Sequence, residues 1–459
     1  MIALGLTMNR IDCVCRQLSI RRLAVGFSFV MIALPVFAGQ TYIESPDTYL
    51  AKLRSLQAGD HLQLMPGVYR HGLPIHHLQG SKSAPITISG PENGSRAIFV
   101  GRSGHNTISI VNARHVVIRD LEINGQGLPV DGVKCEGHAD WAHHITLEKL
   151  FIHRHDHNQQ IVAISTKCPA WHWVIRHNVI SGAGTGIYLG DSDGRAPFVA
   201  GLIEHNLVID TLGYNLRITH QQSRPTLSEM PGDASKTIIR HNVFSKAANN
   251  GVKKMARPNV LVGHWPLSGA GQNDQYLIYG NFFYQNPYES LFQGEGNIAL
   301  YNNIFVNHLG NGIRIQPHKD NPRKVSIFFN TVFVAGSGIH LANRHKVVSF
   351  PQWIANNAIF AQRPLTGIAT HHDDNNFLRS YQAAQNYLVQ PFRPPGQMNL
   401  TPQIQTMNQI KIDSSKASVY PDWNQDFDGH SSDQRFGAYA YPGSVNWLPQ
   451  LEIKPKVMP

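Results

Sequence analysis

The feature that most constrains the fold is an internal repeat of the form aliphatic-x-x-Asn-x-aliphatic. Two upstream segments, 118–123 and 147–152, keep the aliphatic positions without the asparagine. The spacings between successive asparagines are 28, 36, 39, 22, 27 and 27 residues. Units of this length without helical periodicity, stacked many times, are typical of a parallel β-helix. The repeat places its asparagines at Asn178, Asn206, Asn242, Asn281, Asn303, Asn330 and Asn357.

A second short strand follows most of these asparagines, with the pattern Gly-aliphatic-x-aliphatic as in "GIYL" from Gly186. Each unit is therefore expected to be one coil of two or three short strands. Asparagine suits the corner because it tolerates the left-handed conformation and its amide can bond the next asparagine. We predict an all-β, single-stranded right-handed parallel β-helix with an Asn ladder, from about residue 60 to 365. A β-sandwich or propeller is the alternative, but units near 22 residues are too short for a four-stranded blade.

Residues 45–56 predict a short amphipathic helix, with Leu50, Leu53 and Leu56 on one side, that caps the open first coil. The expected organisation has four parts. They are a signal peptide at 1–38, the N-terminal cap and first coils at 39–100, central coils at 101–365, and a C-terminal coil and tail at 366–459.

The first 38 residues predict a secreted or periplasmic protein. Arg21 and Arg22 precede an apolar run that is too short for a confident membrane span, and a small-residue cleavage site precedes Gly39. No membrane span is expected after signal removal.

Of the four cysteines, Cys135 and Cys168 remain after residues 1–38 are removed, and they fall on consecutive coils. They form either a disulfide or two buried thiols.

The charge balance favours an anionic partner. The formal net charge is +10, and without residues 1–38 it is +7. An export signal and the lack of Lys/Arg-rich runs disfavour nucleic acid. The remaining candidate partners are an acidic polysaccharide and an anionic envelope surface. The protein is expected to be a monomer.

The middle residue of each second strand is expected to point outward, because side chains alternate along a strand. On stacked coils these residues would form one basic and aromatic stripe, suited to an extended polyanion; the alternative is a solvated face. The predicted stripe is Lys134, Val162, Tyr188, Arg217, Lys253, Phe292, Arg314 and His340.

Two long insertions, 221–236 and 255–274, leave the same corner of adjacent coils and should form one wall beside the stripe. Lys254 and Gln293 stand where other copies have inward aliphatic residues, which predicts a bulge or a buried lysine there. The wall and its neighbours supply the further candidate residues His220, Arg257, His264, Glu289, Glu295, Gln316 and His318.

Three stretches carry a resemblance to the chondroitinase B and alginate lyase family of right-handed β-helix polysaccharide lyases or to secreted β-helix proteins more widely. Two of them, "AGDHLQLMPGVYR" with "APITISG" and "YGNFFYQNP" to "FQGEGNIALYNNIF", resemble that family itself. The third, the tail Asp426–Ala440, resembles the closing signature of many secreted β-helix proteins. The resemblance implies a lysine and an arginine on neighbouring coils, and calcium held by one Asn and two Glu. Asn215 and Arg217 stand where calcium-binding acids are expected, and the lysine position is Gln221 or Gln222. No cofactor is therefore expected; calcium is the possible exception, but its usual ligands are not matched.

β-Elimination from a uronate remains possible without calcium. It needs a neutralised carboxylate, a base for the adjacent proton and a donor for the departing oxygen. Arg217 is the expected neutralising cation and His220 or Lys254 the base, with Lys253 or Arg257 assisting.

Three alternatives stay open at this point: a glycoside hydrolase, a C5-epimerase, and a non-catalytic polysaccharide-binding or export scaffold. A glycoside hydrolase needs two carboxylates, for which Glu289 with Glu295 or Asp191 with Asp193 are candidates. A C5-epimerase shares the proton-abstraction step, with His153–Asn158 as an acid/base or metal cluster or as solvated turn residues. A non-catalytic polysaccharide-binding scaffold or an export scaffold would keep the stripe without needing the two loops.

Overall fold

A computed structural model describes residues 39–248, 255–318, 322–342, 350, 352–367, 372–404, 406–407, 410–440 and 445–456. The chain divides into two units, residues 1–38 and Gly39–Pro459. The signal-peptide prediction, together with Lys253 and Lys254, lies outside the described residues. Within the described residues, no helix is both long enough and apolar enough to cross a membrane.

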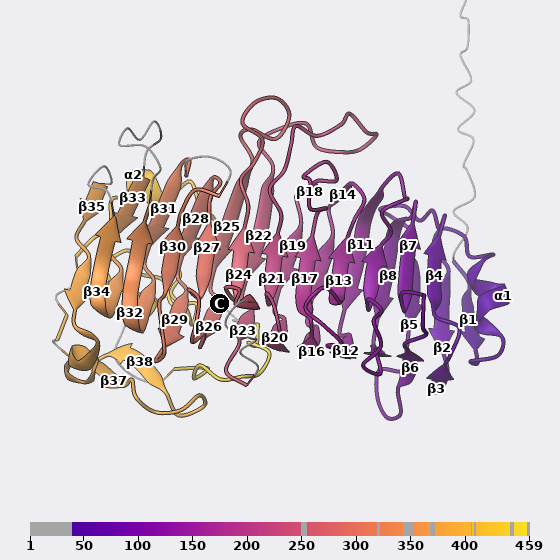
Figure 1. The fold of residues 1–459 in the computed structure, drawn as a ribbon, viewed down its shortest axis with the longest axis horizontal. Coiled ribbons are helices and arrows are strands. Elements are labelled where there is room, and N and C mark those ends of the chain that lie inside the picture. The colour runs from indigo at the N-terminus through magenta and orange to yellow at the C-terminus, as the bar shows by residue number, and fades with distance from the viewer. Residues whose placement is uncertain are drawn as a thin grey trace, which may run out of the picture. The chain divides into compact units, whose positions relative to one another are not determined.

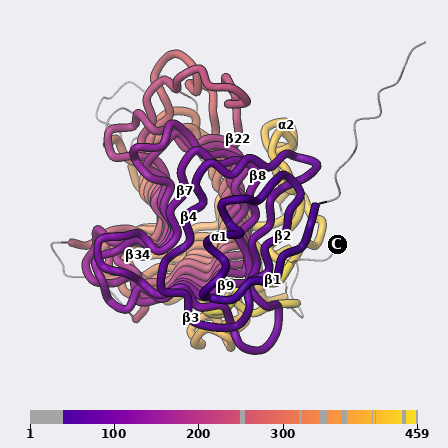
Figure 2. Tube along the Cα trace, turned by 90° about the vertical axis from the view of Figure 1, so that its right-hand side faces the viewer, coloured from indigo at the N-terminus to yellow at the C-terminus, as the bar shows by residue number. Residues whose placement is uncertain are grey.

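The Gly39–Pro459 unit is a parallel β-helix whose coils contribute strands to three long faces (Figures 1 and 2). Strands of one face pair in parallel with the equivalent strands of the coils before and after. We name the faces A, B and C in the order in which the chain visits them. The predicted fold class is confirmed.

Face A is the continuous sheet that begins at the N-terminal end of the unit. The short strands β14 (Ala170–Trp171) and β18 (Phe198–Val199) extend it at one corner. Its strands are β1 (Thr41–Glu44), β2 (His61–Leu64), β5 (Ile86–Ser89), β8 (Arg114–Arg119), β11 (Ala142–Glu148), β15 (Val174–Arg176), β19 (Leu202–Glu204), β22 (Lys236–Arg240), β25 (Gln275–Tyr279), β28 (Ile298–Tyr301), β31 (Val325–Phe328), β33 (Gln352–Ala355) and β35 (His372–Asp374).

Faces B and C share the two longest strands, β32 (Thr331–Leu341) and β34 (Ala358–Gly367), which run through both faces. The other strands of face B are β3 (Gly67–Tyr69), β6 (Ala97–Val100), β9 (Leu121–Asn124), β12 (Phe151–His155), β16 (Val179–Ala183), β20 (Leu207–Thr211), β23 (Val243–Ser245), β26 (Phe282–Tyr284), β29 (Ile304–Asn307) and β36 (Phe377–Arg379). Those of face C are β4 (Leu73–His76), β7 (Ile108–Val111), β10 (Val133–Cys135), β13 (Val162–Thr166), β17 (Thr185–Leu189), β21 (Leu216–Ile218), β24 (Val260–Val262), β27 (Phe292–Gly294) and β30 (Ile313–Ile315).

The core fills the inside of the coils. On face C, the inward residues form one column in which each side chain stacks on the equivalent residue of the next coil, and all are buried. Burial of such a column provides the main stabilisation of the coil stack. The column comprises Ile187, Leu216, Val260, Phe292, Ile313 and Ile339.

The Asn ladder is present at the corner between faces A and B. Each ladder asparagine donates its side-chain amide to the Oδ1 of the next, at 2.8–3.0 Å, and the ladder continues beyond the prediction to Asn376. The left-handed residue is not the asparagine itself but the residue before it, for example His177 (φ 55°) and Phe329 (φ 54°). The asparagine is therefore selected for its amide, because its side chain satisfies buried backbone groups of two coils.

The expected second strand at Gly251 is displaced. The strand that pairs with β21 and β27 is β24, Val260–Val262, so the sequence pattern around residue 251 did not locate it. Residues 249–254 lie outside the described residues. The displacement shortens the insertion that follows the strand to residues 263–274.

The N-terminal helix α1 (Tyr49–Leu53) is shorter than the predicted segment 45–56. Leu53 and Leu56 are buried in the core, Leu50 is partly buried against it, and Tyr49 joins them. In Figures 1 and 2, α1 lies at the first coils. Its role as a cap stays a prediction.

The C-terminal segment packs back along the outside of the coils. It contains a 3₁₀ helix (Tyr381–Asn386), the antiparallel pair β37 (Leu388–Gln390) and β38 (Asn399–Pro402), and α2 (Ser414–Ala417). Buried Arg435 donates to Oδ1 of Asn302, and buried Lys454 donates to the carbonyl of Gly280. The tail therefore contacts coils far upstream in the sequence.

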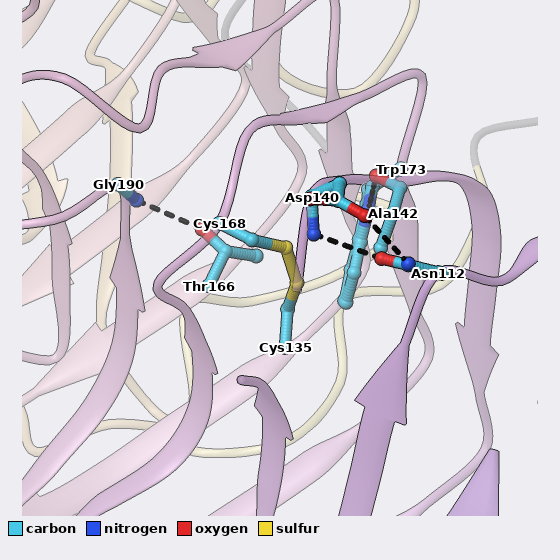
Figure 3. Close-up of a disulfide and its surroundings, with 8 residues drawn as sticks. All are labelled: Asn112, Cys135, Asp140, Ala142, Thr166, Cys168, Trp173 and Gly190. Atoms are coloured by element: carbon cyan, nitrogen blue, oxygen red, sulfur yellow. Dashed lines mark hydrogen bonds between the residues drawn. A yellow bond between two sulfur atoms is a disulfide. The ribbon is translucent and has the colours of Figure 1, made fainter. Parts of the chain in front are cut away.

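Cys135 and Cys168 form a disulfide between adjacent coils of face C, with a Cα–Cα distance of 6.1 Å (Figure 3). Nearby, Thr166 Oγ1 accepts from the Gly190 amide, which ties a third coil to the same corner. The predicted bridge is confirmed, and the alternative of two buried thiols is excluded.

Replacing a central ladder asparagine tests the role of the ladder. Oδ1 of Asn242 accepts from the backbone and side-chain amides of Asn206. Asn242→Ala leaves these buried donors unpaired, so we expect the free energy of unfolding to fall by roughly 2–4 kcal/mol in urea denaturation. Exposed Asn93→Ala is the control and should stay within about 0.5 kcal/mol of wild type. Equal stability of the two variants would contradict a structural role for the ladder.

Candidate functional site

The outward stripe of face C exists, but its register differs from the predicted one at three positions. Ser165, Leu261 and Gln293 occupy the places assigned to Val162, Lys253 and Phe292. Phe292 points inward and is buried. The stripe is Lys134, Ser165, Tyr188, Arg217, Leu261, Gln293, Arg314 and His340.

The sequence pattern placed Gln293 at an inward position, but the structure places it on the outward side of the strand. It lies in register between Leu261 and Arg314, and its Nε2 donates to Glu289 at 2.8 Å. It is buried at 4% exposure, and no bulge is needed to place it on the outward side of the strand. The prediction for Lys254 cannot be compared, because it falls outside the described residues.

A compact group of cations and tyrosines lies at the middle of face C. We call Lys167, Tyr188, Tyr214, Arg217 and Arg257 the cation–tyrosine cluster. The Tyr188 ring centroid lies 3.5 Å from Nζ of Lys167 and 5.0 Å from Cζ of Arg217. The Tyr214 centroid lies 5.3 Å from Cζ of Arg217 and 6.0 Å from Cζ of Arg257. Two tyrosine rings thus hold three cations beside one another.

These cations differ from those of face A in forming no ion pair with a carboxylate of the described residues. On face A, arginines form ion pairs such as Arg176 with Glu148 and Arg240 with Glu204. Among the described residues, no carboxylate forms an ion pair with Lys167, Arg217 or Arg257. The charge of the cluster is therefore available to an anion from outside the chain.

Burial shifts the proton affinities of the cluster. Burial lowers the pKa of Lys167 to about 8, and the neighbouring cations Lys134 and Arg217 add to this effect, whereas Asp131 opposes it. The Tyr188 pKa is raised by burial although Arg217 opposes the rise. Near neutral pH the lysine has an accessible neutral form and the tyrosine keeps its proton, so the pair offers a base and an acid.

Lys134 and the two aspartates of "GDSDG" have local partners. Lys134 forms an ion pair with Asp131 at 3.2 Å, which makes it a weaker anchor than Arg217. Asp191 accepts from the Ala196 amide and Asp193 from the Arg195 amide, so both carboxylates shape a turn. This geometry favours the structural interpretation of the two aspartates.

The two long loops form a wall at one end of the face C strands, as predicted, and project together in Figure 1. Loop 219–235 and loop 263–274 are joined by a buried ion pair in which Arg224 Nη2 donates to both oxygens of Asp274 at 2.8 Å. The rings of His220 and His264 lie 5.4 Å apart at the base of this wall. His264 is largely buried, and its Nδ1 lies 2.8 Å from the Trp265 carbonyl.

The next coils carry a polar chain rather than a pair of free carboxylates. Gln316 Nε2 lies 3.2 Å from Gln293 Oε1 and 3.3 Å from His318 Nε2. Glu289 accepts from Gln293, and Glu295 is buried with 1% exposure. This arrangement does not present Glu289 and Glu295 as two open carboxylates.

A pocket of about 220 Å³ lies on face C beyond the polar chain. Arg314, His340 and Arg363 line it together with Ser337 and Thr366. His340 Nδ1 lies 2.8 Å from Thr366 Oγ1, and burial lowers the His340 pKa. The stripe therefore ends in a second cationic site.

The residues near Arg217 do not fit calcium. Asn215 is buried, and its Nδ2 donates to Thr211 and to the Ser245 carbonyl. Gln221 is also buried and donates to the Phe198 carbonyl. The outward neighbours of Arg217 are Tyr188 and Leu261, which bring no carboxylate where calcium requires several oxygens.

The histidines at 153–158 have partners outside the cation–tyrosine cluster. His153 contacts Glu122 at 3.1 Å, His155 is buried against the Val130 carbonyl, and His157 contacts the Gly127 carbonyl. Of these, buried His155 is not a solvated turn residue as predicted.

Sequence reasoning missed Lys167 and Tyr214. Lys167 follows strand β13 directly and precedes disulfide-bonded Cys168, so it stands outside the repeated pattern from which the stripe was deduced. Tyr214 precedes the strand β21 and is likewise outside the pattern. The only sequence signal was their proximity to features already identified, Cys168 and Arg217.

Residues 160–383 match the family described as "Right handed beta helix region". The chain carries a right-handed β-helix region. No curated protein matches the chain closely enough to serve as a relative.

Three solved structures show the extent of the structural similarity. An alginate lyase from Paenibacillus sp. str. FPU-7 is 13% identical, with 74% of this chain and 99% of that chain covered and a TM-score of 0.35. A lacto-N-biosidase from Eubacterium ramulus is 13% identical, with 74% and 67% covered and a TM-score of 0.49. The A-module of a mannuronan C-5 epimerase from Azotobacter vinelandii is 12% identical, with 73% and 92% covered and a TM-score of 0.39. Similarity at this level assigns no activity to this right-handed β-helix chain.

The loop wall can be tested through its buried ion pair. Arg224→Met leaves the Asp274 carboxylate buried without its partner, and we expect the free energy of unfolding to fall by about 3–5 kcal/mol. Adding Asp274→Asn should restore part of the loss in chemical denaturation. The control Arg195→Met breaks an exposed pair with Asp193 and should change stability by less than about 1 kcal/mol. A loss no larger than that of the control would contradict the coupling of the two loops.

Proposed function

We propose that this protein is a secreted or periplasmic enzyme that cleaves an acidic, uronate-containing polysaccharide by β-elimination on face C. The observation that carries the proposal is the cation–tyrosine cluster, in which Lys167 and Arg217 flank one ring, Tyr188, and form no ion pair within the described residues. Coils stack about 4.8 Å apart, close to the length of one sugar unit, so neighbouring coils can contact neighbouring sugars.

Arg217 is the proposed partner of the uronate carboxylate. Its Nε makes no hydrogen bond within the described part of the chain, and its guanidinium lies beside the rings of Tyr188 and Tyr214 without an ion-paired carboxylate there. A guanidinium binds a carboxylate through two parallel hydrogen bonds. Neutralising the carboxylate makes the adjacent C5 proton more acidic, which is the requirement for elimination.

Lys167 is the proposed base, in place of the Lys254 or His220 expected from the sequence. The neutral amine takes the C5 proton, the electron pair of that bond forms the C4–C5 double bond, and the bond from C4 to the leaving oxygen breaks. Tyr188 donates a proton to that oxygen, since its raised pKa keeps the hydroxyl protonated. His220 and Arg257 assist at the edge of the site, and no calcium or other cofactor takes part.

The remaining stripe residues are proposed to bind the rest of the polymer. Lys134 lies toward the N-terminal end, and Gln293, Arg314 and His340 lie toward the C-terminal end. A chain bound along the stripe would contact cations at both ends of the face. The mature protein is proposed to act as a monomer, because the stripe lies within a single chain.

The activity prediction uses variants of the two central cations. With a panel of acidic polysaccharides, the wild type should produce the ultraviolet absorbance of an unsaturated uronate. Arg217→Ala should lower kcat/KM by roughly 10²-fold or more. Lys167→Arg keeps the charge but not the base, and should lower kcat at least 10²-fold with a smaller change in KM. Lys134→Ala should mainly raise KM.

Arg176→Met, which removes a paired cation of face A, is the matched control and should behave as wild type. Chain shortening without the absorbance would instead indicate a hydrolase. Proton exchange without cleavage would indicate a C5-epimerase, and binding without either would indicate a scaffold. Normal activity of Lys167→Arg would exclude Lys167 as the base.

The pH dependence follows from the lowered pKa of Lys167, about 8. The base must be neutral, so turnover should rise as the pH increases through about 8 and then level off. If Lys167 acted only as a cation, turnover would fall over the same interval. Initial rates between pH 6 and 9.5, measured at saturating substrate, distinguish the two roles.

A further inference from the structure

A cluster of three histidines and one glutamate lies away from the cation–tyrosine cluster, at the corner where β8 and β11 meet the loop wall. Ligand atoms of His115, His143, His144 and Glu229 all lie within 4.8 Å of one another. The three histidines come from two neighbouring coils of face A, and Glu229 comes from loop 219–235. The sequence analysis gave these four residues no metal-binding role, and no local motif joins them.

We propose that these four side chains form a binding site for a divalent transition-metal ion of the zinc class, which fastens loop 219–235 to the coils. Three imidazoles and one carboxylate are a donor set that suits Zn²⁺ and excludes a hard ion such as Mg²⁺. Four protein ligands close the coordination sphere, which is typical of a structural rather than a catalytic zinc site.

The spacing of the ligand atoms fits one small ion. Nδ1 of His143 and Nδ1 of His144 share a hydrogen bond of 2.7 Å, in which a bound ion would take the place of the proton, and Nε2 of His115 lies 3.9 Å from Oε2 of Glu229. Tetrahedral bonds of about 2.0 Å place ligand atoms roughly 3.3 Å apart, between these two distances. The 3.9 Å gap is too long for a hydrogen bond, so the imidazole and the carboxylate do not already satisfy each other.

The backbone directs the histidines to one side of the coils. His115 and His144 adopt left-handed conformations, with φ of 51° and 53°, on adjacent coils, and their rings stack at 4.2 Å. His143 is buried and stacks on Trp171 at 4.4 Å, which fixes its ring.

The carboxylate is oriented by a partner outside the ligand set. Arg114 Nη1 donates to Oε1 of Glu229 at 2.8 Å, which leaves Oε2 facing His115. Such outer contacts hold a ligand in place and neutralise its surroundings. In this arrangement the Glu229 carboxylate also compensates the positive charge of Arg114 before the ion binds.

A second histidine stack in the same molecule provides a comparison, because a lysine rather than a carboxylate contacts its rings. His177, His205 and His241 stack at 5.0–5.1 Å on successive coils of face A. Lys454 contacts this stack, with Nζ 3.4 Å from His241 Nδ1 and its carbonyl 2.8 Å from His205 Nδ1. The amino group of Lys454 occupies the position beside the second stack where a metal ion would have to bind. In the first cluster, the equivalent neighbour of the histidines is the carboxylate of Glu229.

The test uses tag-free full-length protein, freed of metal by dialysis against a chelator and titrated with zinc chloride in a calorimeter. We expect one site per chain and a melting temperature that rises by several degrees with zinc and does not change with magnesium. Glu229→Gln and His115→Gln should each weaken zinc binding at least 10-fold and remove the rise in melting temperature. Glu92→Gln, which breaks a comparable Arg–Glu pair with Arg119, and His177→Gln in the second stack should bind as wild type.

Cobalt provides a readout that does not depend on the variants. Wild-type protein loaded with Co²⁺ should show the intense visible absorption of a tetrahedral site. Weak octahedral absorption, the absence of a zinc site, or unchanged binding by both Glu229→Gln and His115→Gln would overturn the proposal. Because every readout is binding or stability, the result is independent of the proposed lyase activity.

Discussion

The parallel pairing of successive coils is the constraint on which the rest of the structure depends. Each strand is three to five residues long on most of face C, so its own hydrogen bonds fix it weakly. The Asn ladder adds a second set of contacts, because each amide bonds the next asparagine and the backbone of the coil before it. Together they hold the coils in a register in which equivalent side chains stack.

The register explains how a site arises from residues that are distant in the sequence. Tyr188 and Arg217 are direct partners on adjacent strands, and Lys167 reaches the same tyrosine ring from the preceding coil. Lys246 illustrates the opposite outcome, since it is buried and donates to the Arg257 carbonyl, where it supports the backbone beside the cluster. Position relative to the coil surface, rather than residue type, separates a candidate catalytic lysine from a structural one.

The two loops beside face C are held in place by ion pairs between residues that are distant in the sequence. Arg224 and Asp274 connect them to each other, and Arg114 with Glu229 connects the first loop to face A. The proposed metal site would strengthen the second connection at the same place. A substrate wall built on mobile loops would order only on binding, at an entropic cost, whereas a fastened wall is arranged beforehand.

The sequence by itself determined the fold class and the ladder asparagines, because both depend on a repeat that is visible in one dimension. It placed Cys135 and Cys168 on consecutive coils, but only the structure decided that they are bridged. It also placed Lys134, Tyr188, Arg217, Arg314 and His340 on the outward stripe. It failed at Phe292 and Gln293, since a one-residue slip in a period of two exchanges the inner and outer faces. It could not place β24, because an insertion moved the strand away from the expected spacing. Only the tertiary structure brought Lys167 to Tyr188 and Glu229 to His115, as these contacts join residues outside the repeat through turns and loops whose course the repeat does not specify.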